Sequence, residues 1–113
     1  MTCPDKVKLL GFIIPIILSD ERDDVWGEWD GGAGTVTLNS KASDDHLRIT
    51  FLHEILHAMD DILGLGISHR NVYAISQILW LLLKENPALT EWLIANLNSP
   101  PSDRSIHSSR TDS

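Results

Sequence analysis

The hydrophobic pattern of the chain changes its period near Ser43, and this change constrains the fold more than any other feature. Before Ser43, short apolar runs rich in β-branched residues are separated by turns containing glycine and aspartate, which is typical of strands. After it, apolar residues recur every three or four positions as far as Leu63, which is helical spacing. Strands followed by helices predict an α+β fold.

The segment before Ser43 predicts a small sheet of three or four strands. The apolar run 9–18 is expected to be buried and forms one strand, or two if it bends at Gly11 or Pro15. Lysines precede this run as in a signal peptide, but it is too short to span a bilayer and no small-residue cleavage site follows. Two more candidates, 25–29 and 35–39, flank the turn DGGAG and predict a hairpin.

Three helices are predicted after this sheet. The first begins at Ser43 or Asp44 and is stopped by Gly64 and Gly66. A long second helix starts near Ser68, and a short third covers residues 87–98. The apolar residues expected to anchor the first helix in the core are Phe51, Leu52, Ile55, Leu56 and Met59.

The length of 113 residues suits one domain, predicted over residues 1–98. The tail 99–113 is rich in proline and serine and lacks apolar periodicity, so it is predicted to be disordered. The net charge of -7, without a basic stripe, argues against a nucleic-acid partner, and no membrane partner is expected. The single Cys3 excludes an internal disulfide and a multi-cysteine metal site, which fits a reducing, cytoplasmic location.

The first predicted helix carries the stretch HEILH, an H-E-x-x-H motif. Residues four apart share a helix face, so His53 and His57 can bind one tetrahedral Zn²⁺ ion. Glu54 lies beside them, where its carboxylate can take a proton from a metal-bound water and pass it to a leaving amine. These residue types at this spacing predict a zinc site with Glu54 as the catalytic base.

A third protein ligand is required, since catalytic zinc has three ligands and one open position. A reversal of the chain at GLG can bring His69, at the start of the second helix, back to the first two histidines. His69 can equally be an exposed residue of that helix's first turn. The rivals are Glu85 and Glu91, which lie late in the chain, while His46 is expected at the rim and His107 in the tail.

Asp60 and Asp61 lie one turn beyond His57. Each is a candidate to orient a ligand imidazole through its other ring nitrogen. An ordinary acidic pair on the helix surface is the alternative.

The motif and its flanks, WGEWD, TVTLNS, ITFLHEILHAMDD and GISHRNVYAISQILWLLLKENP, resemble zincin metallopeptidases. The resemblance is to small, often phage-encoded, metallopeptidase-like proteins related to the ImmA/IrrE and SprT-like groups, and it runs from Trp26 to Pro87. It implies a small sheet on the motif helix, an edge strand that pairs with an extended peptide, and Zn²⁺ as cofactor. In SprT-like proteins a third histidine follows the second by a little over ten residues, which favours His69; the related groups often use a glutamate on a following helix. The chain is shorter than most zincins and lacks an obvious N-terminal backing helix, so it resembles a minimal version.

The sequence therefore predicts a soluble zinc metallopeptidase acting on a peptide or protein. The alternative is a non-catalytic zincin-fold module that acts through protein contacts, with structural or absent zinc. Four tryptophans are candidates for such a contact surface, although large aromatic residues more often belong to the core: Trp26, Trp29, Trp80 and Trp92. The sequence leaves the oligomeric state and the cleavage specificity open.

Overall fold

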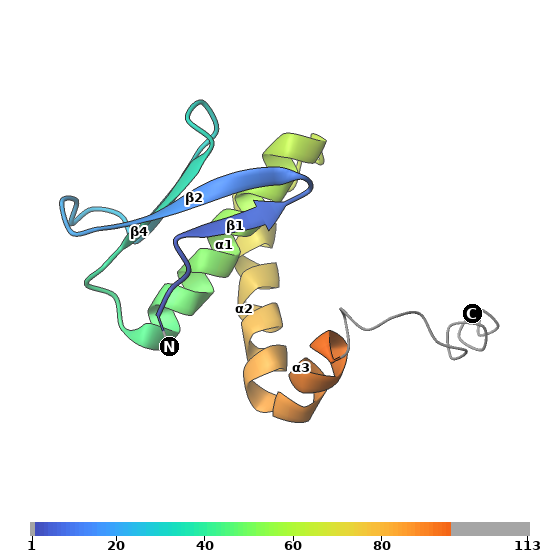
Figure 1. Ribbon diagram of the computed structural model, residues 1–113. Helices are drawn as coiled ribbons and strands as arrows, with labels where there is room; N and C mark the ends of the chain where they lie inside the picture. Colours follow the sequence, from blue (N-terminus) through green and yellow to red (C-terminus); the bar gives the residue numbers. More distant parts are fainter. Residues whose placement is uncertain (1, 96–113) are drawn as a thin grey trace.

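A computed structural model describes residues 2–95 as a four-stranded mixed sheet and three helices, of which the first packs against the sheet (Figure 1). The α+β prediction is confirmed. The strands are β1 (Lys6–Leu9), β2 (Phe12–Ser19), β3 (Gly27–Asp30) and β4 (Thr35–Asn39), and the helices are α1 (Asp44–Leu63), α2 (His69–Glu85) and α3 (Pro87–Ile94). The predicted disordered tail 99–113 lies outside the described residues.

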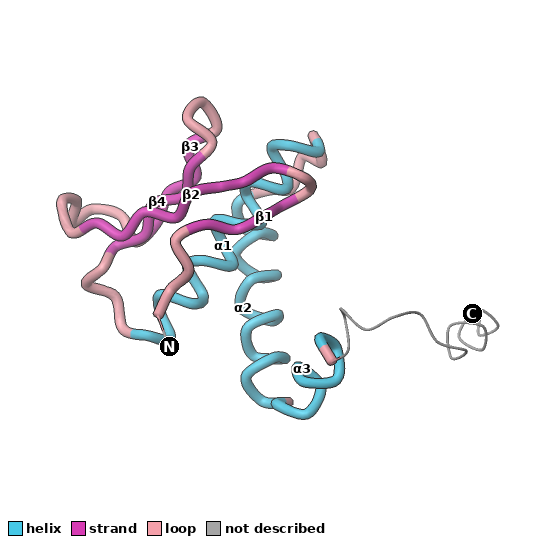
Figure 2. The backbone as a smooth tube through the Cα atoms, viewed as in Figure 1, coloured by secondary structure: helices cyan, strands magenta, loops and turns pink. Residues whose placement is uncertain are grey.

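The strand order β1-β2-β4-β3 places β3 at one edge of the sheet, beside α1 (Figure 2). β1 is antiparallel to β2, β2 is parallel to β4, and β4 is antiparallel to β3. Pro15 lies where β2 changes neighbours, because residues 12–15 pair with β1 and residues 16–19 pair with β4. A proline that lacks an N–H donor is tolerated at such a break in the ladder.

The core lies between the sheet and α1. Its buried residues come from the inner faces of β2 and β4 and from α1, and they are Ile14, Ile16, Val36, Leu38 and Ala58. The outer face of the sheet is uncovered, so Ile13 and Ile17 on β2 are exposed. The prediction that the whole run 9–18 is buried is therefore wrong, because a two-layer fold covers only every second residue of a strand.

The local sequence accounts for the ends of the elements. The run 9–18 divides into two strands at a turn where Leu10 and Gly11 have positive φ. Ser43 caps α1 by accepting a hydrogen bond from the His46 N–H, and α1 ends at Gly64, whose left-handed conformation suits glycine. Ser68 caps α2 in the same way.

Two predicted boundaries and part of the predicted core differ from the structure. The hairpin strand predicted at 25–29 begins at Gly27, because the chain bends at Trp26. The predicted third helix 87–98 ends at Ile94, since Ala95 has an extended conformation, and residues 96–98 lie outside the described residues. Among the predicted core residues of α1, Phe51 and Ile55 pack on the core, whereas Leu52, Leu56 and Met59 are half-buried outside it. Within residues 2–95 no helix has the length and apolarity needed to cross a membrane.

Candidate metal centre

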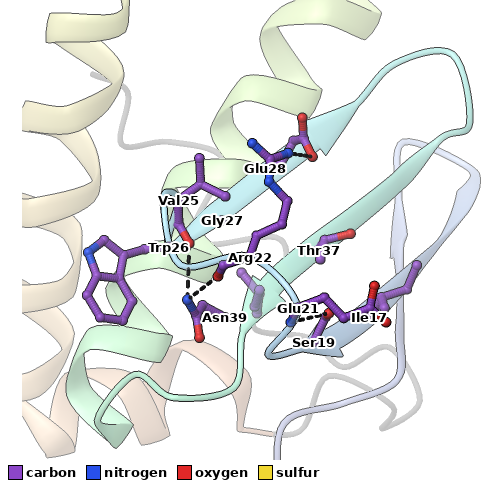
Figure 3. A pocket seen from close by; sticks show the side chains of 11 residues that line it. Ile17, Ser19, Glu21, Arg22, Val25, Trp26, Gly27, Glu28, Thr37 and Asn39 are labelled. Atoms are coloured by element: carbon purple, nitrogen blue, oxygen red, sulfur yellow. Dashed lines mark hydrogen bonds and ion pairs between the residues drawn. The ribbon is translucent and has the colours of Figure 1, made fainter.

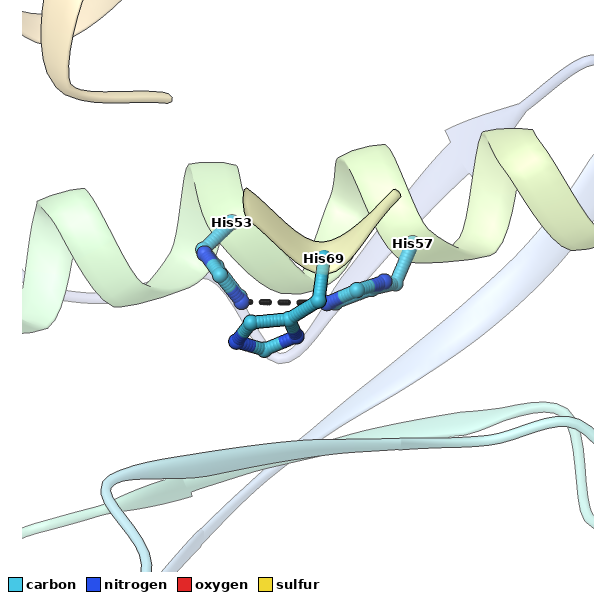
Figure 4. Close-up of side chains that lie close together, drawn as sticks. All are labelled: His53, His57 and His69. Atoms are coloured by element: carbon cyan, nitrogen blue, oxygen red, sulfur yellow. Dashed lines mark hydrogen bonds between the residues drawn. The ribbon is translucent and has the colours of Figure 1, made fainter. Parts of the chain in front are cut away.

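Three histidines from two helices converge at the junction of α1 and α2 (Figure 4). His53 and His57 lie one turn apart on α1, with their Nε2 atoms 3.0 Å apart. His69 opens α2, and its ring centroid lies 4.9 Å from that of His53 and 5.0 Å from that of His57. One ring nitrogen from each residue lies within 4.8 Å of the other two. The structure therefore brings together the three residues predicted as ligands.

The turn between the helices brings His69 to the motif. Gly64 and Gly66 both have positive φ, which glycine adopts at little cost. Asp60 holds the turn through two hydrogen bonds. Its carboxylate accepts one from the Ile67 N–H at 3.0 Å, and its backbone carbonyl accepts one from the Leu65 N–H at 3.1 Å. The returning chain thereby places His69, the first residue of α2, beside the rings of His53 and His57.

The donor set fits zinc. Two ligands at about 2.0–2.1 Å from one tetrahedral ion lie about 3.3 Å apart, close to the 3.0 Å between the His53 and His57 nitrogens. Three imidazoles are one of the ligand sets of catalytic zinc, which keeps its fourth position for water or substrate. His53, His57 and His69 therefore suit an open zinc site.

Two of the three histidines, His53 and His57, have lowered pKa values, which favours the neutral form that a metal requires. Burial, with the nearby rings of His57 and His69, lowers the pKa of His53 from 6.5 to about 4. Burial and His69 also lower the pKa of His57, against an opposing effect from the Asp60 carboxylate. Protons therefore compete weakly for these nitrogens at neutral pH.

Glu54 faces the sheet, not the solvent side of α1. It is only 7% exposed and lies on the same buried face as Thr50 and Ala58. Burial raises its pKa from 4.5 to about 7, a backbone hydrogen bond from Trp29 lowers it in part, and the charge of Glu28 raises it further. Glu54 lines the same cleft as His53 and His69, but successive helix positions point 100° apart. Its side chain is therefore directed to the sheet, whereas that of His53 is directed towards α2.

Gly27, at the start of β3, makes this packing possible. A Cβ atom there would lie 2.5 Å from the Thr50 methyl group, 3.1 Å from Glu54 Cγ and 3.2 Å from Glu54 Oε2. Only glycine lets the strand approach the motif helix this closely. The sequence predicted that Gly27 lies in a strand and Thr50 in the first helix, but it assigned neither residue a role. The feature that could have indicated this close approach is a glycine inside a predicted strand, in WGEW.

A cleft of about 600 Å³ opens beside the histidines, and its wall includes His53, Glu54 and His69. The rings of Trp26 and His46 pack against each other at its side in a tilted arrangement, with centroids 4.5 Å apart. The predicted rim position of His46 is consistent with this contact. The remaining lining residues are Asp24, Val25, Gly27, Ser43, Asp45, Ile49, Thr50, Tyr73 and Gln77.

The loop that carries Trp26 is anchored on the other side by Asn39 (Figure 3). The Asn39 side-chain amide donates to the backbone carbonyls of Arg22 and Val25, at 3.0 and 3.2 Å. These bonds border a second pocket of about 300 Å³ on the sheet side of the loop. Asn39 thereby sets where Trp26 enters the cleft.

The other candidate residues lie apart from the three histidines. Asp61 accepts a hydrogen bond from the Trp29 indole N–H at 3.0 Å and so ties α1 to β3. Glu85 ends α2 and Glu91 lies in α3, and within residues 2–95 neither belongs to the cluster that can hold a metal. His107 lies outside the described residues. Orientation of a ligand ring by Asp60 or Asp61 stays a prediction.

No protein-family model, no curated protein and no solved structure matched this chain. A function must therefore be inferred from its own residues.

Proposed function

We propose that the chain is a zinc-dependent metallopeptidase of the zincin type. The observation that carries this proposal is the meeting of three histidine nitrogens from two helices beside a cleft that also includes Glu54, a buried carboxylate. A strongly perturbed acid next to a set of metal ligands in a cleft is the arrangement expected of a hydrolytic site.

His53, His57 and His69 would hold the ion. When bound, zinc supplies a Lewis acid that polarises the substrate carbonyl and lowers the pKa of water to about 7. The chain contributes a fixed frame for it, because the ligands lie on two helices joined by a short, hydrogen-bonded turn.

Glu54 acts as the proton carrier. Hydrolysis adds a hydroxyl to the carbonyl carbon and a proton to the amine nitrogen as the C–N bond breaks. Glu54 accepts the proton of the attacking water and then donates it to the departing amine, a role for which a pKa near the working pH is best. Its pKa of about 7 meets that condition.

The edge strand β3 supports a peptide as the substrate. Within residues 2–95 β3 pairs only with β4, so its other edge offers backbone groups to an extended chain, the recognition mode of β-augmentation. Gly27, at the start of this strand, touches Glu54. A peptide along β3 would therefore pass the proposed base, with the cleft at Trp26 open to one of its side chains.

Metal content tests the first part of the proposal. We expect about one zinc per chain in the purified wild type, and strong loss of zinc in His53→Ala, His57→Ala and His69→Ala. His46→Ala is the matched control, since it removes an imidazole from the same helix outside the cluster. Unchanged zinc affinity in His69→Ala would show that the third ligand is wrong.

Hydrolysis tests the second part. Glu54→Gln should retain zinc and lose peptide cleavage by about 10²–10⁴-fold, measured by mass spectrometry on a mixed peptide library, while Glu91→Gln, an exposed glutamate on α3, keeps it. A second candidate function is a non-catalytic interaction module, favoured by the exposure of Trp26 and Trp92, at 49% and 72%. Zinc binding without any Glu54-dependent cleavage would support that candidate and refute the peptidase.

A further inference from the structure

α2 has two apolar faces, and within residues 2–95 one of them is buried and the other is exposed. The inner face contains Val72 and Ser76, which are fully buried, and α1 is the element α2 contacts most. The other face carries four large apolar side chains with exposed fractions between 42% and 67%: Ile75, Ile78, Leu81 and Leu82. We call these four residues the outer stripe. Part of α2 projects beyond the sheet, so the stripe is accessible (Figure 1).

The spacing of the stripe is that of a helix–helix contact line. Asn71, Ile75, Ile78, Leu82 and Glu85 follow one another at intervals of four, three, four and three residues, the a and d positions of a heptad repeat. The line is apolar in its middle and polar at both ends. Over the 17 residues of α2 it extends about 25 Å, and a contiguous apolar line of this kind marks an interaction surface.

The charges at the two ends favour a second copy of the same helix in the opposite direction. Arg70 near the start and Glu85 at the end are both exposed, on the flank of the stripe that Leu81 marks. Neither forms an ion pair with another of residues 2–95. In an antiparallel pair the same flanks meet, so Arg70 of each copy lies beside Glu85 of the other. In a parallel pair Arg70 and Glu85 would lie at opposite ends of the contact, so neither charge would meet its opposite.

We propose that the outer stripe binds a second copy of this chain, with the two α2 helices antiparallel and related by a two-fold axis at Ile78. Such an isologous contact uses the same surface twice and closes at two subunits. Ile78 faces its own copy on the axis, and Ile75 faces Leu82 of the partner subunit. The apolar stripe supplies the affinity, and the exposed charges set the direction.

This dimer leaves both candidate metal centres open. His69 and Tyr73 lie on the opposite side of α2 from the stripe, by about half a helical turn, and it is this side that borders the cleft. The proposal is independent of the proposed peptidase activity, because none of its residues belongs to the metal cluster.

Light scattering and sedimentation equilibrium on the full chain test the contact. At about 200 μM we expect a mass of twice the 12.6 kDa of one chain. Ile78→Asp places two carboxylates against each other on the axis and should weaken self-association at least about 100-fold. Leu65→Asp is the matched control, since Leu65 is 55% exposed in the turn between α1 and α2, outside the stripe; it should dimerise like the wild type.

Cysteine cross-linking in a Cys3→Ser background tests the geometry without relying on a destabilising charge. Ile78→Cys should form a disulfide with its own copy, whereas Ile75→Cys should form one only when mixed with Leu82→Cys. A monomeric wild type at this concentration, or a folded Ile78→Asp that still dimerises, would overturn the proposal. Self-linking of Ile75→Cys as efficient as that of Ile78→Cys would overturn the antiparallel arrangement.

Discussion

Replacing Glu54 by glutamine should stabilise the metal-free protein, and only at neutral and alkaline pH. In the folded chain the carboxylate is 7% exposed and its pKa is raised from 4.5 to about 7. Between these two pH values the folded state binds a proton that the unfolded state has released. The free energy of unfolding of the wild type therefore falls as the pH rises from 4.5 to about 7, and it stays low above that. Glutamine has the same shape and no charge, so the variant escapes this loss.

The size of the effect follows from the shift in pKa. One pKa unit corresponds to about 1.4 kcal/mol, so the shift to about 7 sets an upper limit of about 3 kcal/mol. The carboxylate borders a cleft that opens to solvent, and screening by water reduces the expected gain to about 1–2 kcal/mol. Glutamine can still accept the backbone hydrogen bond from Trp29.

Urea denaturation with a chelator present, at about pH 4 and about pH 8, measures the difference. Glu54→Gln should exceed the wild type in free energy of unfolding at the higher pH and match it at the lower one. Glu91→Gln, an exposed glutamate, serves as the control and should match the wild type at both. Equal effects at the two pH values, or a less stable variant at pH 8, would refute the claim that burial of an ionised Glu54 costs stability.

Three further predictions follow from the contacts around the site. Gly27→Ala should lower the free energy of unfolding by about 1–3 kcal/mol in thermal or urea denaturation, because the new Cβ would overlap Thr50; an unchanged stability would contradict this. Asp60→Ala should weaken zinc binding by about 10–100-fold in a chelator competition, since it removes the hydrogen bond from the Ile67 N–H that holds the turn. An unchanged zinc affinity would show that the turn keeps its conformation without this hydrogen bond. The His53 ring of the metal-free chain should titrate near pH 4 in an NMR pH titration, because burial and the rings of His57 and His69 lower its pKa from 6.5 to about 4; a midpoint near 6.5 would show an ordinary histidine.

The order and type of the elements could be predicted because local rules decide them. Alternating apolar residues, the Gly-rich hairpin turn and the helix caps at Ser43 and Ser68 each depend on neighbours in the chain. The crossing of β2 to pair in parallel with β4 depends instead on contacts between distant segments. The exposure of the outer sheet face likewise follows from how many layers the whole fold has, which no single strand encodes.

The candidate site divides in the same way. The face shared by His53 and His57 follows from a spacing of four on a helix, whereas the position of His69 depends on two glycines with positive φ and on one aspartate bond. The burial of Glu54 could not be predicted, because the apolar residues around it suggested a different core face. That burial depends on the close approach of β3 at Gly27, a contact between residues 27 positions apart in the sequence.

Adjacent positions on α1 contact two different parts of the fold, which explains how the proposed ligand His53 and the proposed base Glu54 can be consecutive residues. A step of 100° turns His53 towards the start of α2, where His69 meets it, and turns Glu54 towards β3, where Gly27 meets it. The ligand set therefore depends on the turn held by Asp60, and the base depends on the strand. Damage to the turn should remove the metal while Glu54 keeps its raised pKa, and damage to the strand should release Glu54 while the histidines keep the metal. The two halves of the proposed chemistry share a helix but are positioned by separate parts of the fold.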